Sequence, residues 1–125
     1  IPEYMAEAND QIISIAIIEH PEAIDHIDEI AGVDGLDLAF IGPGDLATAL
    51  EHPGQFDHPE FVAAVAAAEA GLLPSHVAVG GVARSAEQAK QMIDRGYRAL
   101  VLGFDWSLLH RATATFLDEI ATLRG

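Results

Sequence analysis

Two carboxylates, Glu19 and Asp45, stand where apolar, strand-like runs end. Glu19 closes Ile-Ile-Ser-Ile-Ala-Ile-Ile-Glu, and Asp45 follows Leu-Ala-Phe-Ile-Gly-Pro-Gly. A carboxylate at the carboxyl end of a buried parallel strand adds little to a fold, but it is well placed to bind a metal or to move a proton. If the two strands are neighbours in a parallel sheet, both carboxylates would lie at the same edge of that sheet and face the same site. The structural alternatives are an N-cap for Asp45 and a first-turn acid before Pro21 for Glu19.

The elements that would position these residues repeat as strand, loop and helix. Continuous apolar runs, which are typical of strands buried on both faces, predict strands at 12–18, 36–41, 76–79 and 99–102. Helices are expected at the chain start and at 21–31, 45–50, 59–71, 85–96 and 106–123. This alternation predicts an α/β protein with a parallel sheet. Four such units fit half of a (β/α)8 barrel or a small open sheet.

Composition excludes several functions. The formal net charge is -14, with one lysine and five arginines, which excludes a nucleic-acid surface and attachment to an anionic membrane. There is no cysteine, hence no disulfide, thiolate metal site or cysteine nucleophile. We find no membrane-spanning run or signal peptide and expect a soluble, cytoplasmic protein. The chain starts with Ile1 inside a helical pattern, so we expect a piece of a longer protein.

The carboxylate pair indicates a hard divalent ion. Adjacent parallel strands lie about 4.8 Å apart, which would bring Glu19 and Asp45 within joint reach of one ion. Oxygen ligands without cysteine favour Mg²⁺ or Mn²⁺, with positions left for water and substrate. The turn Gly42-Pro43-Gly44 removes side chains just before Asp45, so a ligand can approach the backbone N–H groups there.

The same residues resemble a known family. Five segments are similar to the HpcH/HpaI aldolases. They are Ile18-Glu19, Gly32-Val33-Asp34-Gly35, Phe40-Ile41-Gly42-Pro43-Gly44-Asp45-Leu46-Ala47, Gly80-Gly81 and Val101-Leu102-Gly103-Phe104-Asp105. The resemblance covers essentially the whole chain. It implies that residues 1–125 are the second, C-terminal half of a TIM (β/α)8 barrel, four βα units with outer helices, and that the N-terminal half is absent from this chain.

The resemblance also implies an activity. It implies a class II, divalent-metal-dependent aldolase that cleaves a 4-hydroxy-2-oxo acid to pyruvate and an aldehyde through a metal-stabilised enolate. Glu19 and Asp45 would bind the ion (Mg²⁺, Mn²⁺ or Co²⁺), and pyruvate would contact Gly44 and Asp45 together with Gly42 and Phe40. The family's catalytic base and oxyanion-binding arginine belong to the half that this chain does not match, so the catalytic residues stay unknown here.

The match has two departures and leaves alternatives open. Ile17 replaces a glutamine that contacts substrate in the family, and His20 replaces a small polar residue. A CoA-thioester lyase of the citrate lyase beta or malyl-CoA type, or a non-catalytic half-barrel, remains open. A phospho-acceptor receiver domain is disfavoured because the one lysine, Lys90, falls in a predicted helix. Family members are homo-oligomers that exchange C-terminal helices, and the apolar surface of the last helix permits either that exchange or core packing.

Other polar residues have structural interpretations that we prefer. We expect a helix start for His20, a solvated loop for Arg84, a surface position for His52 and His58, and a site at the opposite end of the sheet for His76. For Asp105, which follows the fourth strand, two interpretations stay open: contact with the entrance of the site, or an N-cap of the last helix.

Overall fold

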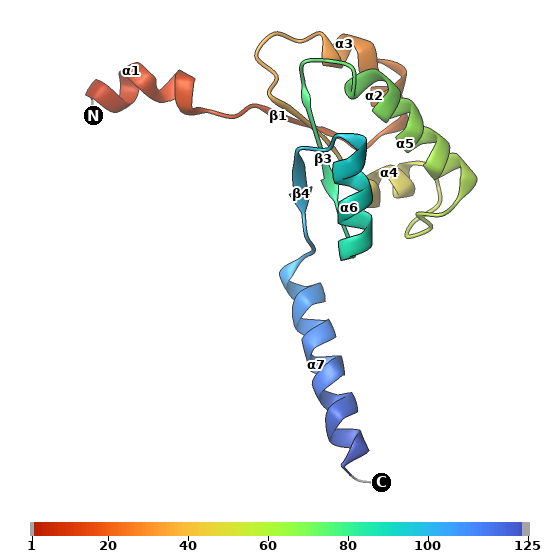
Figure 1. The fold of residues 1–125 in the computed structure, drawn as a ribbon. Helices are drawn as coiled ribbons and strands as arrows, with labels where there is room; N and C mark the ends of the chain where they lie inside the picture. The colour runs from red at the N-terminus through yellow and green to blue at the C-terminus, as the bar shows by residue number, and fades with distance from the viewer. Residues whose placement is uncertain (1, 124–125) are drawn as a thin grey trace.

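The computed structural model, which describes residues 2–123, is an α/β domain built on a parallel sheet (Figure 1). Its four strands pair in the order β1-β2-β3-β4, so each strand neighbours the next along the chain. The strands are β1 (Ile15–Ile18), β2 (Leu38–Ile41), β3 (Ala78–Val82) and β4 (Ala99–Val101). The helices are α1 (Pro2–Gln11), α2 (Pro21–Asp25), α3 (Ile27–Ala31), α4 (Pro43–Ala49), α5 (Pro59–Leu72), α6 (Ala86–Arg95) and α7 (Asp105–Thr122). The predicted fold class is therefore confirmed.

The hydrophobic core lies on one face of this sheet. Helix α5 contacts β2, β3 and α3. The core strands contribute side chains that are almost completely buried, among them Ile18, Ala39 and Val79. On the same face, a methyl group added at Gly81 would lie 2.8 Å from Met92 Cε, so the glycine lets α6 approach the sheet closely.

The opposite face of the sheet is partly open among the described residues, at strand β1. Ile15 pairs with Leu38, and Ile17 pairs with Phe40, so these side chains share that face. Ile15 is 54% exposed and Ile17 is 57% exposed. Apolar residues therefore occupy both faces of the strands, as the continuous runs predicted. The second face is exposed at β1, whereas Leu38 of β2 on the same face is only 9% exposed.

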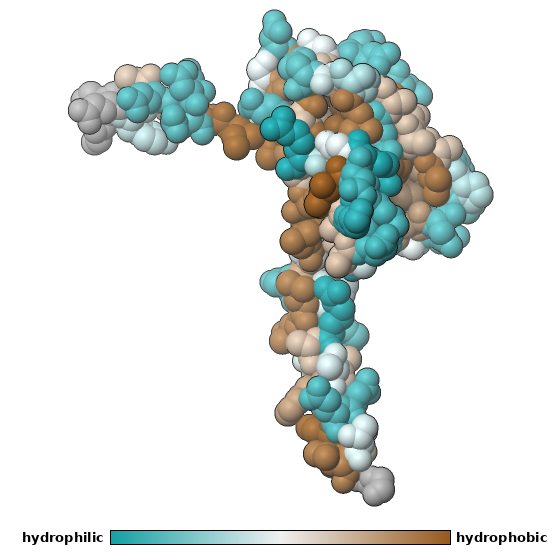
Figure 2. Space-filling model, viewed as in Figure 1, coloured by the Kyte–Doolittle hydropathy of each residue, from teal (hydrophilic) through white to brown (hydrophobic). Residues whose placement is uncertain are grey.

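Helix α7 projects away from the sheet (Figure 1) and has no buried residue. Its apolar side chains are exposed, including Trp106 at 69%, Leu109 at 70% and Phe116 at 61%. Figure 2 shows hydrophobic residues gathered along one side of the projecting helix. Packing of this helix on its own sheet, one of the two readings of its apolar surface, is therefore not what the structure shows. None of the described helices is long and apolar enough to cross a membrane.

Several element boundaries differ from the predicted ones. The helix expected at 21–31 is two short helices that meet at His26. β3 starts at Ala78 and continues through both glycines to Val82, because its register is set by pairing with β2 and β4. Gly71 lies inside α5, where an added methyl group would meet Ile27 Cγ2 at 2.6 Å. That glycine serves close packing between α5 and α3 instead of ending the helix.

A buried tyrosine ties α5 to the strand region. The Tyr97 hydroxyl donates a 2.7 Å hydrogen bond to Glu69 Oε1, and Arg95 Nε lies 3.2 Å from the same oxygen. We expect Tyr97→Phe to lower the free energy of unfolding by about 1.5 kcal/mol, the value of a hydrogen bond to a charged acceptor. Chemical denaturation of the wild type and of Tyr97→Phe measures this difference in the free energy of unfolding.

The hydrogen bond between Tyr97 and Glu69 also predicts that the stability of the fold depends on pH. Burial, and then the Glu69 carboxylate, raise the pKa of Tyr97 far above its ordinary value. The unfolded chain therefore loses this proton first as the pH rises past about 10, and stability falls there. The stability difference between the wild type and Tyr97→Phe should narrow above that pH. A difference that stays constant up to pH 11 would contradict the assigned role.

Candidate functional site

A cavity of about 650 Å³ opens at the carboxyl edge of the sheet. Segments that follow all four strands contribute to its wall. The lining residues are Ile17, Glu19, Phe40, Gly42, Pro43, Gly44, Asp45, Phe56, Val82, Arg84, Gly103, Phe104, Trp106, Ser107, His110 and Arg111. All five residues predicted for the metal and the substrate, Glu19, Phe40, Gly42, Gly44 and Asp45, are among them. In parallel α/β folds this edge is where ligands bind.

Glu19 lies directly against the turn that follows β2. A methyl group at Gly42 would be 3.3 Å from Glu19 Cβ and 3.4 Å from Glu19 Oε2. The Gly42 N–H donates a 2.9 Å hydrogen bond to the Ile18 carbonyl oxygen, which extends the β1–β2 ladder to this turn. The missing side chain at position 42 thus lets the Glu19 carboxylate lie beside the segment that carries Asp45.

Neither carboxylate has the structural role offered as its alternative. The N-cap of α4 is Gly42, and Asp45 is the third residue of the helix, so Asp45 is not an N-cap. Glu19 precedes the α2 N-cap, His20, and lies outside the helix. None of the four ion pairs formed between described residues involves either acid. Both carboxylates remain available to a cation.

The backbone at Gly44 is open to a ligand. A methyl group there would find no atom within 4 Å, so the chain's own packing does not require glycine. The first backbone hydrogen bond within α4 runs from the Leu46 N–H to the Gly42 carbonyl. The N–H groups of Gly44 and Asp45 precede it in the helix and need acceptors from elsewhere. An anionic oxygen in the cavity would be such an acceptor.

Two arginines and a histidine complete the cavity wall. Arg84 is exposed in the loop after β3, as expected, and its guanidinium also lies 4.3 Å from the centre of the Phe56 ring; both residues line the cavity. His110 and Arg111, from the first turns of α7, also line it. Sequence reasoning gave neither of these two a role. His110 and Arg111 follow Trp106 and Ser107, which also line the cavity, by four residues. Because residues four apart share one face of a helix, this spacing is the sequence signal that could have indicated them.

The remaining candidates have local structural roles. His20 Nδ1 accepts a 3.3 Å hydrogen bond from the Glu22 N–H at the start of α2, as expected. His76 is exposed ahead of β3, at the other end of the sheet. Asp105 is not the N-cap of α7, because Phe104 takes that position. Phe40 lies across Gly80, where an added methyl group would be 2.9 Å from Phe40 Cδ2.

The donor set fits a hard divalent ion. Two exposed carboxylates share the cavity, and the chain contains no cysteine, so the two acids offer oxygen ligands of the kind that Mg²⁺ and Mn²⁺ prefer. Glu19 and Asp45 would hold such an ion, with the other coordination positions left to water and substrate oxygens.

Comparison with known proteins defines the class. Residues 1–112 match the family model HpcH/HpaI aldolase/citrate lyase. The chain belongs to this family, as the resemblance in its motifs predicted. It is 37% identical over 119 residues to a hydroxypyruvate/pyruvate aldolase from Delftia acidovorans, a match that covers 95% of this chain and 44% of that protein.

Two further relatives agree. A 4-hydroxy-2-oxo-heptane-1,7-dioate aldolase from Escherichia coli is 36% identical over 112 residues, which is 90% of this chain and 43% of that protein. The crystal structure of a family member from Burkholderia cenocepacia superposes with a TM-score of 0.88 at 36% identity, over 95% of this chain and 46% of that one. The chain thus spans less than half the length of these relatives.

Proposed function

We propose that this chain is the C-terminal half of a divalent-metal-dependent aldolase that cleaves a 4-hydroxy-2-oxo acid to pyruvate and an aldehyde. The observation that carries the proposal is a pair of carboxylates, Glu19 and Asp45, that follow adjacent strands and form no ion pair among the described residues. They share one cavity with the glycine-rich turn Gly42-Pro43-Gly44. The related aldolases support the reaction class. The partly open face of the sheet supports the half-barrel, because a barrel would bury that face.

The chain's residues have separate tasks in this proposal. Glu19 and Asp45 hold the ion (Mg²⁺, Mn²⁺ or Co²⁺). When bound, the ion supplies Lewis-acid stabilisation of the negative charge that develops on the 2-oxo acid during cleavage. The N–H groups of Gly44 and Asp45 receive the carboxylate of the 2-oxo acid, and Gly42 and Phe40 shape the wall beside it. The general base and the arginine that stabilises the oxyanion come from outside this chain.

The proposed assembly is a homo-oligomer. Helix α7 has an apolar side with no partner among the described residues, and family resemblance points to exchange of this helix between subunits. We propose neither a nucleic acid nor a membrane as a partner. The substrate is a small 2-oxo acid, and the second product is an aldehyde that the residues of this chain do not specify.

One experiment separates this function from its alternatives. The full-length protein would be assayed with 4-hydroxy-2-oxo acids and with citryl- and malyl-CoA, each with Mg²⁺, with Mn²⁺ and with excess EDTA. We expect cleavage of the free 2-oxo acid that stops with EDTA and returns with metal. Preference for a thioester would instead establish the CoA lyase, and no turnover of any substrate would support the non-catalytic half-barrel.

Gly44→Ala tests the carboxylate seat. The added methyl group meets nothing in the folded chain, and alanine stabilises a helix position relative to glycine by about 0.4–1 kcal/mol. We therefore expect unchanged or slightly raised thermal stability. We expect kcat/KM for the 2-oxo acid to fall roughly 10- to 100-fold because the substrate is displaced.

The matched control is Gly32→Ala. Its methyl group makes an ordinary 3.4 Å contact with the backbone, and Gly32 does not line the cavity. The kcat/KM values of Gly44→Ala and Gly32→Ala, measured under the same conditions, are compared. If Gly44→Ala cleaves the substrate as well as Gly32→Ala does, the substrate carboxylate does not lie against this turn.

A further inference from the structure

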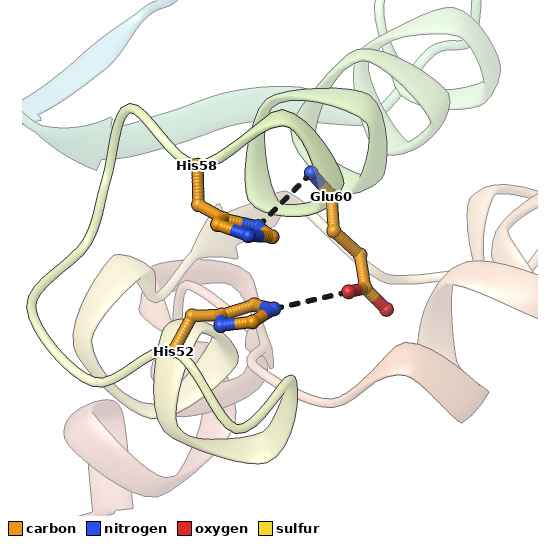
Figure 3. A network of polar contacts seen from close by, with 3 residues as sticks. All are labelled: His52, His58 and Glu60. Atoms are coloured by element: carbon orange, nitrogen blue, oxygen red, sulfur yellow. Dashed lines mark hydrogen bonds and ion pairs between the residues drawn. The ribbon is translucent and has the colours of Figure 1, made fainter.

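A second group of metal-ligating side chains lies outside the cavity. His52 and His58 stand at the two ends of the loop between α4 and α5, and Glu60 is in the first turn of α5 (Figure 3). None of the three lines the cavity of Glu19 and Asp45. The two imidazole rings stack with centroids 3.5 Å apart and planes inclined by 28°. The loop thus closes on itself through its histidines.

Glu60 joins the stacked pair at one edge. His52 Nε2 lies 3.1 Å from Glu60 Oε2. One ligand atom from each residue falls within 4.8 Å of the others. Figure 3 shows the Glu60 side chain extending from the helix past His58 to His52. The His52 side chain is 24% exposed and that of Glu60 is 59% exposed, so an ion could enter from solvent.

Helix capping alone does not account for this arrangement. His58 Nδ1 accepts a 3.3 Å hydrogen bond from the Glu60 N–H, and asparagine or serine would cap the helix as well or better. Capping also requires nothing of His52. Two stacked imidazoles repel each other when both are protonated, whereas one divalent cation shared between them and a carboxylate satisfies all three groups.

We propose that His52, His58 and Glu60 bind a transition-metal ion, with Zn²⁺ as the best match. Two imidazoles and one carboxylate favour Zn²⁺, Co²⁺ or Ni²⁺ over the Mg²⁺ that suits an all-oxygen pair. Three protein ligands leave a fourth position of a tetrahedral zinc ion to water. The ion would take the place of the contact between His52 and Glu60. Because an imidazole ligates a metal only through a deprotonated nitrogen, metal binding at such a site weakens as the pH falls.

Binding requires a defined local change. Metal–ligand bonds of about 2.0–2.2 Å require the ligand atoms to draw closer together than 4.8 Å. A neutral imidazole has one lone pair, so His58 gives up its capping hydrogen bond when it ligates. Both changes fall in the loop between α4 and α5 and in the first turn of α5. Phe56, from this loop, lines the cavity beneath Arg84, so the ion would clamp a part of the cavity wall.

Co²⁺ is the probe because its visible absorption reports the ligand set. The full-length protein would carry Glu19→Gln and Asp45→Asn, so that the site proposed above cannot contribute. Titration followed by absorption and calorimetry should show one tightly bound Co²⁺ per chain with a tetrahedral spectrum. Zn²⁺ should displace the Co²⁺ and excess Mg²⁺ should not.

Three variants and one control assign the ligands. His52→Gln, His58→Asn and Glu60→Gln should each weaken Co²⁺ binding at least about tenfold. Asparagine at position 58 keeps a cap for α5, and circular dichroism verifies that each variant is folded. His76→Gln replaces an exposed histidine elsewhere and should bind Co²⁺ like its parent.

Two results would overturn the site. One is the absence of a tetrahedral Co²⁺ spectrum in the parent protein. The other is a Co²⁺ affinity of folded His52→Gln, His58→Asn and Glu60→Gln equal to that of His76→Gln. Neither result bears on Glu19 and Asp45, which are already replaced in the parent, so the aldolase proposal is tested separately.

Discussion

Asp45→Ala should abolish metal-dependent cleavage of a 4-hydroxy-2-oxo acid by the full-length protein. Asp45 supplies one of two carboxylates at the cavity, so its replacement removes one of the two proposed protein ligands of the ion. Lewis-acid stabilisation contributes several kcal/mol, so we expect a loss of at least about 10³-fold in kcat/KM. Steady-state kinetics with saturating Mn²⁺ would measure it.

The control for this variant must share the helix position of Asp45. Glu22 is an exposed acid in the first turn of α2, as Asp45 is in the first turn of α4, but Glu22 does not line the cavity. Glu22→Ala should lose only the effect of a helix-start charge, about 0.3–1 kcal/mol of stability, and should keep its activity. Metal-dependent turnover that survives in Asp45→Ala would show that Asp45 is not a ligand.

The 125 residues alone should be at least about 100-fold less active than the full-length protein. General acid–base catalysis contributes roughly 10²–10⁴-fold, and we place both the base and the stabilising arginine outside this chain. The chain alone also exposes part of one face of its sheet, including Ile15 and Ile17, and the apolar side of α7. Turnover numbers of the two purified proteins, compared at equal concentration, give the ratio.

Complementation provides the control for that comparison. If the proposal is correct, adding the separately produced remainder of the full-length protein should cover the open face and restore metal-dependent cleavage. The isolated chain should also elute as an aggregate or oligomer in size-exclusion chromatography, because large exposed apolar surfaces associate. Aldol cleavage by the isolated chain within tenfold of the full-length rate would refute the division of the site between two halves.

The order of elements was predictable from the sequence, while some of their limits were not. Continuous apolar runs correctly identified four strands, and the helices expected at 59–71 and 85–96 correspond to α5 and α6. The third strand was placed too early because glycine weakens a strand pattern. Gly80 and Gly81 belong to the strand, since Phe40 presses on one face and Met92 on the other. Such contacts appear only after tertiary packing.

The site was predictable where it depends on strand ends. Glu19 and Asp45 follow strands that are neighbours, so their position at one cavity follows from topology. His110 and Arg111 were missed because they reach the cavity from a helix whose direction no local pattern predicts. The stacking of His52 on His58 depends on how the loop folds back, which also has no sequence signal.

Mn²⁺ affinity measured in a double-mutant cycle tests the central claim, that Glu19 and Asp45 hold one ion. The full-length wild type, Glu19→Gln, Asp45→Asn and the double variant would be titrated with Mn²⁺ and followed by electron paramagnetic resonance. Sharing of one ion predicts that each single replacement removes most of the affinity and that the double replacement adds little more. Two losses that simply add, or a wild-type affinity retained in either single variant, would contradict it.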